Sequence, residues 1–123
     1  MFRDIIITAT VLLIIDAMFI ASISSFFTNQ IELVQKDKFT FDILGGFVAY
    51  VFLIFGLYWF IIREKRSLLD AFLLGIVIYG VYEGTTKALF KKWKKETMLI
   101  DTIWGGTLFS LTTIIVRKLT VYI

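Results

Sequence analysis

Three charged side chains interrupt apolar sequence in the second half of the chain. Glu83 and Lys87 lie inside one apolar run, and Asp101 lies near the start of the next. A carboxylate that precedes an ammonium by four residues can pair with it on one helix. A hairpin about Trp93 would bring Asp101 level with Lys87, because helical residues rise by about 1.5 Å each. The spacing therefore predicts one polar site made by two helices.

Further polar side chains fall at the same depth. Tyr79, Tyr82 and Thr86 share a helical stripe with Glu83 and Lys87, while the rest of that run is apolar. Asp16 lies about eight residues before the end of the first run, and Tyr50 lies about seven residues after the start of the second. Both positions are therefore expected at the same depth, measured from the same side of the membrane. The predicted intramembrane polar cluster is Asp16, Tyr50, Tyr79, Tyr82, Glu83, Thr86, Lys87, Asp101 and Trp104.

Three arrangements of these charged residues are considered. A mid-membrane charge costs about 2.5–3.5 kcal/mol on insertion scales, so the charges must be paired, neutralised or hydrated. One interpretation is an internal salt-bridge network that fixes the register of the helices. The other is a polar pocket for a lipid headgroup, a small polar ligand or protons. In a third arrangement, Lys87 extends outward and pairs with nothing.

Catalysis is the less favoured interpretation. Glu83 or Asp101 could act as a base with Tyr79 or Tyr82 as an acid, as in a lipid-modifying enzyme. The sequence has no nucleophile elbow, phosphate-binding loop or metal-ligand set. It also has no cysteine and no histidine, which excludes thiol chemistry and the usual zinc, copper and haem ligands. No catalytic residue, cofactor or metal is predicted.

Composition indicates a membrane protein. Hydrophobic residues make up 59% of the 123 positions, too many for a small soluble domain with a large polar surface. The net charge is +3, and the basic residues lie at the ends of apolar runs rather than in a groove among aromatics. This pattern predicts contact with lipid headgroups and argues against nucleic acid.

Four continuous apolar runs predict the fold, at about 5–24, 43–62, 68–90 and 98–116. Each is close to the ~20 residues that span a bilayer as a helix, and none alternates as a barrel strand would. The prediction is an all-α polytopic membrane protein, one domain over 1–123, with four transmembrane helices in an antiparallel bundle. Residues 25–42 are expected to form an interfacial amphipathic segment. The first run contains Asp16 and exceeds a typical signal-peptide core, so it is expected to be retained.

The links between the runs suggest how the helices are arranged. "REKRSL" and "KKWKKE" are short, which predicts antiparallel hairpins and makes Ser67 a cap for the third helix. Gly105 and Gly106 would allow close backbone approach. The second of these links supplies the predicted headgroup-facing residues, Lys91, Lys92, Trp93, Lys94 and Lys95. Basic residues number six on each side of the membrane, so they do not define the orientation.

Several short motifs resemble a known family. The residues that carry the resemblance are Tyr79-Gly80-x-Tyr82 with an acid next, Thr85, and Asp101-x-x-Trp104-Gly105, with Asp16 and Tyr50 as secondary matches. Together they resemble the domain-of-unknown-function family 2177, small four-helix membrane proteins known mainly from bacteria and also encoded by large DNA viruses. The resemblance covers nearly the whole chain. It implies the four-helix membrane fold and no particular activity.

The favoured function from sequence is a structural or assembly component of a membrane, such as a membrane-containing complex or virion. Its partners would be the bilayer and neighbouring proteins, in a cell membrane or an internal viral membrane. This hypothesis requires the polar cluster to be fully paired. The alternative is a binding or transport protein that uses the cluster for a ligand or protons, and neither proline nor an internal repeat supports a transporter with broken helices.

Overall fold

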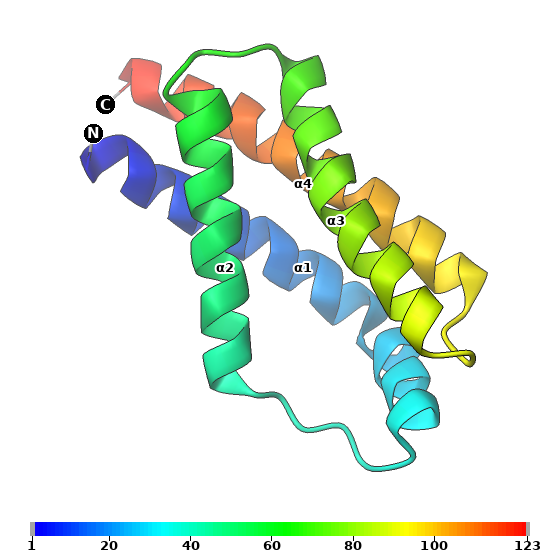
Figure 1. Cartoon of the computed structure of the whole chain (residues 1–123). Coiled ribbons are helices and arrows are strands. Elements are labelled where there is room, and N and C mark those ends of the chain that lie inside the picture. Colours follow the sequence, from blue (N-terminus) through cyan, green and yellow to red (C-terminus); the bar gives the residue numbers. More distant parts are fainter. Residues whose placement is uncertain (1, 123) are drawn as a thin grey trace.

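The computed structural model describes residues 2–122, and these form helices joined by links (Figure 1). The helices are α1 (Phe2–Gln35), α2 (Ile43–Leu57), which continues into the π-helical turn η1 (Tyr58–Ile62), α3 (Leu68–Leu89) and α4 (Lys95–Tyr122). Within residues 2–122, four spans are long and apolar enough to cross a membrane, α2 and η1 counting as one. The predicted all-α, four-span architecture is confirmed.

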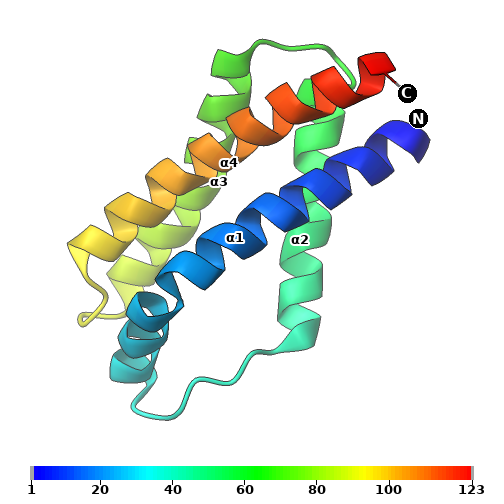
Figure 2. The same cartoon turned by 180° about the vertical axis from the view of Figure 1, so that it is seen from behind.

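The helices pack unevenly. α3 lies along α4 over most of its length, and α4 also packs against α1. α2 contacts α1, and its η1 end reaches both α1 and α4, whereas α2 and α3 share no extensive contact. Figures 1 and 2 show the beginning of α2 standing apart from the other helices, and both termini at one end of the bundle. The predicted hairpin of the second and third helices is therefore antiparallel but open.

Local sequence explains where two of the helices begin. The Asp42 carboxylate caps α2 by accepting from the backbone N–H groups of Leu44 and Gly45. The Ser67 hydroxyl caps α3 by accepting from the N–H of Asp70 at 3.1 Å, as the sequence predicts. These caps satisfy N–H groups that have no partner inside the helix.

The first helix is longer than predicted. It passes through a kink at Ile23, where φ is −123° and ψ is 17°, and continues to Gln35. Residues 25–35 of the predicted interfacial segment are thus helical, and only 36–42 form the link to α2. Residues 25–35 contain no glycine or proline that would end the helix, so polar composition alone is a poor guide to its boundary.

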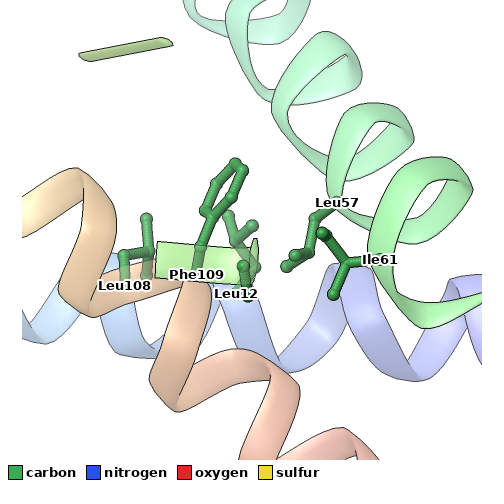
Figure 3. Packing of buried hydrophobic residues seen from close by; sticks show 6 residues of the cluster. Leu12, Leu57, Ile61, Leu108 and Phe109 are labelled. Atoms are coloured by element: carbon green, nitrogen blue, oxygen red, sulfur yellow. The ribbon is translucent and has the colours of Figure 1, made fainter. Parts of the chain in front are cut away.

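The hydrophobic core lies toward the end of the bundle that holds the termini. Leu12 of α1 meets Leu57 and Ile61 from the α2–η1 span and Leu108 and Phe109 of α4, as Figure 3 shows. All five side chains are buried. The core therefore holds α2 to the bundle at its last turns and leaves its first turns free.

A glycine contact explains why α3 and α4 pack so closely. A Cβ built on Gly75 would overlap the backbone carbonyl of Gly105, and one on Gly105 would overlap the ring of Tyr79. Backbones can approach this closely only where side chains are absent. The packing role predicted for Gly105 is confirmed.

The outer surface is apolar. Phe52 on α2, Val81 on α3 and Leu99 on α4 are each more than 60% exposed, and many other large hydrophobic side chains accompany them. In water such a surface would promote aggregation, whereas in the hydrocarbon of a bilayer its exposure carries no free-energy penalty. The chain is an integral, polytopic membrane protein.

Candidate functional site

Asp16 joins three helices. It lies on α1 with 6% of its surface exposed. The Tyr50 hydroxyl of α2 donates to Asp16 Oδ2 at 2.5 Å, and the Trp104 indole of α4 donates to Asp16 Oδ1 at 2.9 Å. The ring of Phe19 stacks on Trp104 with centroids 4.1 Å apart. Asp16, Tyr50 and Trp104, predicted to share one layer, do come together there.

Glu83 is fully buried and only half satisfied. Its Oε1 accepts from the Trp93 indole N–H at 2.7 Å. Its Oε2 has no hydrogen-bond partner among the described residues, although the side chain is 0% exposed. A buried carboxyl oxygen without a donor is costly, so this atom marks a place where a donor is missing.

Trp93 corrects one of the predictions. It was expected to anchor the protein at the headgroups, but only 5% of it is exposed and its indole points to Glu83. The buried carboxylate offers a charge-assisted hydrogen bond that an interface position lacks. The four lysines around it are exposed, consistent with a headgroup-facing link.

The predicted salt-bridge network is wrong. Within residues 2–122, the salt bridges are Arg3–Asp4, Arg63–Glu64 and Arg66–Asp70, and none lies in the polar cluster. Lys87 extends toward the link after α3, where its Nζ lies 3.5 Å from the Lys91 carbonyl. The long lysine stem allows the ammonium to leave the apolar region, so it follows the third arrangement considered from sequence.

A small cavity of about 210 Å³ lies beside Glu83. Carboxyl groups reach it from three helices: Asp16 from α1, Glu83 from α3 and Asp101 from α4. Tyr79 and Tyr82 also line it. Thr86 does not: its hydroxyl donates to the Tyr82 carbonyl at 2.8 Å, a bond within its own helix. The cavity thus gathers five of the nine predicted cluster residues and leaves out Tyr50, Thr86, Lys87 and Trp104.

A larger cavity of about 630 Å³ occupies the space between α2 and α3. Its α2 wall is apolar and includes Ala49, Phe52, Leu53, Phe55 and Gly56, and Ile78 belongs to its α3 wall. Four residues line both cavities, namely Asp16, Tyr79, Tyr82 and Asp101. The apolar space therefore ends on the carboxyl and phenol groups of the small cavity.

Gln30 is a residue that sequence reasoning missed. It is 4% exposed and holds the link after α3 through three contacts. Its Nε2 donates to the Lys92 carbonyl at 3.0 Å, while its Oε1 accepts from the Lys94 N–H at 3.0 Å and from the Thr97 hydroxyl at 3.1 Å. These bonds fix the link on either side of Trp93. Gln30 sits in a polar stretch beyond the predicted first span, and no local pattern distinguishes it there.

The described residues offer no group of three or more acidic, cysteine or histidine side chains arranged to hold a metal ion. What the site presents is a set of buried carboxyl groups, phenols and aromatic walls next to an apolar space. That arrangement can accept hydrogen bonds, hold protons or surround a cation, and a hydrocarbon chain fits its apolar part.

Comparison with known families matches residues 1–117 to the family described as "Predicted membrane protein (DUF2177)". The match covers nearly the whole chain, including all the residues of both cavities. No curated protein and no solved structure matches the chain.

Proposed function

We propose that this chain, which belongs to the DUF2177 family of predicted membrane proteins, binds an amphiphilic molecule that enters from the bilayer between α2 and α3. The observation that carries the proposal is the 630 Å³ cavity whose apolar walls end on carboxyl and phenol groups, among them the buried Asp16. A volume of this size is typical of ligand pockets, about 300–1,000 Å³. Its mixed lining suits a molecule with a hydrocarbon part and a polar end.

The packing of α2 supports this function. The helix is fixed to the core by Leu57 and Ile61, while its first half has little contact with α3. An apolar groove inside a bilayer does not stay empty, because an empty groove forfeits dispersion contacts on every wall. A chain from a lipid or another amphiphile restores those contacts without any change in the bundle.

The structural role favoured by the sequence has lost its main support. It required charges that are fully paired within the protein, so that the cluster did nothing more than hold the helices together. Lys87 instead lies by the Lys91 carbonyl, and Glu83 Oε2 has no donor among residues 2–122. A half-satisfied cluster next to a cavity is better explained by a ligand that completes it.

The proposal can be tested by a substitution that fills the larger cavity with a side chain. Gly56 lines the larger cavity, and a Cβ built on it meets nothing within 4 Å, so Gly56→Leu directs a side chain into that space. Gly84→Leu is the matched control: a Cβ there also meets nothing within 4 Å, but Gly84 lines neither cavity. Both changes replace a helical glycine with a strong helix former, so neither should lower stability.

The binding assay uses dodecyl amphiphiles that differ in headgroup, added to the protein in maltoside micelles and detected by native mass spectrometry. We expect at least one amphiphile to remain bound to the wild type and to Gly84→Leu, and to be lost from Gly56→Leu. Equal binding of every amphiphile to all three proteins would show that the cavity binds none of them and would refute the proposed function.

A further inference from the structure

We propose that the polar end of this ligand is an organic ammonium group, held by Glu83 in the small cavity beside Trp93. The inference rests on the proposed function and names the chemical class of its ligand. It concerns the 210 Å³ cavity, which is large enough for a headgroup and too small for a whole amphiphile.

One carboxyl oxygen of Glu83 lacks a hydrogen-bond partner among the described residues. Glu83 is 0% exposed and lines the small cavity, with Oε1 already accepting from Trp93. Oε2 faces no donor from the described part of the chain. Asp16, by contrast, has a donor on each oxygen, from Tyr50 and Trp104. Glu83 Oε2 therefore receives a proton from the described part of the chain only where the Asp101 carboxyl shares one with it, and an N–H group of a ligand would take the place of that donor.

The charged residues that line the cavities favour a cation over an anion. Three acidic residues line the small cavity, and no lysine or arginine lines either cavity. Lys87, four residues after Glu83, lies by the Lys91 carbonyl and not in the cavity. A phosphate or carboxylate headgroup would meet acceptors and like charges there. A cation would supply the donor and the opposite charge together.

Aromatic side chains also line the small cavity, and they favour a cation. Phe19 and Phe27 from α1, Tyr79 and Tyr82 from α3, and Trp93 from the link all line the small cavity. Aromatic rings attract cations through their π faces, and they do so more strongly where water is excluded. Carboxylates combined with several rings are the recurrent means by which proteins recognise ammonium ions.

The path into the cavity is consistent with such a ligand. Asp101 and the two tyrosines line both cavities, so the headgroup site and the apolar groove meet at these side chains. An alkylammonium ion can thus place its chain between α2 and α3 and its nitrogen against Glu83. A free metal ion or inorganic cation would leave the groove unused.

The test compares dodecyltrimethylammonium and dodecylammonium with dodecan-1-ol and dodecyl sulfate, which have the same chain and a neutral or anionic end. Each is titrated against the wild type, Glu83→Gln, Asp101→Asn and Glu96→Gln in maltoside micelles. Glu83→Gln keeps an oxygen for the Trp93 indole and removes the negative charge. Glu96→Gln removes the same charge from an exposed side chain outside both cavities. Circular dichroism checks that every variant remains helical.

We expect the wild type and Glu96→Gln to bind the ammonium amphiphiles about tenfold more tightly than dodecan-1-ol, and Glu83→Gln to lose that preference. Asp101→Asn should reduce it in part, which gives a second variant should Glu83→Gln fail to fold. If binding depends on an open groove at Gly56 but shows no preference for a cation, or if Glu83→Gln keeps the preference, the ammonium inference is refuted while the proposed function stands. Binding that Gly56→Leu leaves unchanged would refute the proposed function itself.

Discussion

The Trp93 indole donates to the Glu83 carboxylate at 2.7 Å, and both side chains are almost completely buried. This bond connects the link after α3 to the interior of the bundle. Glu83 lines the small cavity, and its second carboxyl oxygen has no hydrogen-bond partner among the described residues. The pair thus ties the position of the link to the polar lining of the small cavity.

Removing the indole donor should destabilise the protein. Trp93→Phe keeps an aromatic ring but leaves Glu83 with no donor on either oxygen, which costs about 1–3 kcal/mol for a buried polar group. Trp59→Phe is the control, because Trp59 is 39% exposed and stacks only with Phe55 and Arg63. Unfolding of both variants in mixed micelles measures the difference. Equal losses would mean that the Trp93–Glu83 bond contributes nothing.

The bond between Tyr50 and Asp16 should hold α2 to α1. Tyr50→Phe removes one of the two donors to Asp16, with an expected loss of about 1–3 kcal/mol in the free energy of unfolding. In an Asp16→Ala background the same change should cost much less, because the acceptor is already gone. Tyr122→Phe, at a side chain that is 86% exposed, serves as the control. Additive effects of the two changes would contradict the coupling.

Close packing of α3 on α4 should depend on Gly105. Its Cβ would overlap the Tyr79 ring, so Gly105→Ala forces the helices apart and should cost about 1–3 kcal/mol. Gly84→Ala has open space and should instead stabilise the helix by about 0.4–1 kcal/mol. Thermal unfolding in detergent distinguishes them. A neutral Gly105→Ala would show that the helices are not in contact there.

Gln30 should control the position of the link that carries Trp93. Gln30→Ala removes the acceptor for the Lys94 N–H and the donor to the Lys92 carbonyl. We expect faster hydrogen exchange at the Lys94 amide and a weaker Trp93–Glu83 bond. Asn29→Ala changes the exposed neighbour and should leave that exchange rate unchanged. Identical exchange in both variants would rule out this role for Gln30.

Much of the fold could be predicted because a helix that spans a bilayer requires a long apolar run, which is visible in the sequence. The predicted second and third spans, at about 43–62 and 68–90, differ little from the α2–η1 span and α3. The first and fourth helices were harder to delimit. α1 continues to Gln35, and α4 begins at Lys95 and ends at Tyr122, because polar residues remain helical where the chain leaves the hydrocarbon and can contact other parts of the protein. A hydropathy pattern does not register those contacts.

For the site, the sequence could predict only how deep each residue lies in the membrane, and not which residues contact one another. Spacing brought Asp16, Tyr50 and Trp104 to one layer, and the structure joins them by hydrogen bonds. Spacing also suggested a Glu83–Lys87 pair, which is absent because a lysine stem is long enough to avoid the interior. Sequence contained no sign that Trp93 turns inward or that Gln30 holds its link, since both depend on contacts between distant segments.

The most direct test of the binding function is to map where an amphiphile lies. A dodecylammonium carrying a photoreactive diazirine in its chain would be activated with the wild type, Gly56→Leu and Gly84→Leu in micelles, and the labelled peptides identified by mass spectrometry. We expect labels concentrated around Leu53 and Ile78 in the wild type and Gly84→Leu, and lost from Gly56→Leu. Labels spread over outward-facing positions such as Leu99 and Ile103, and unchanged by Gly56→Leu, would contradict it.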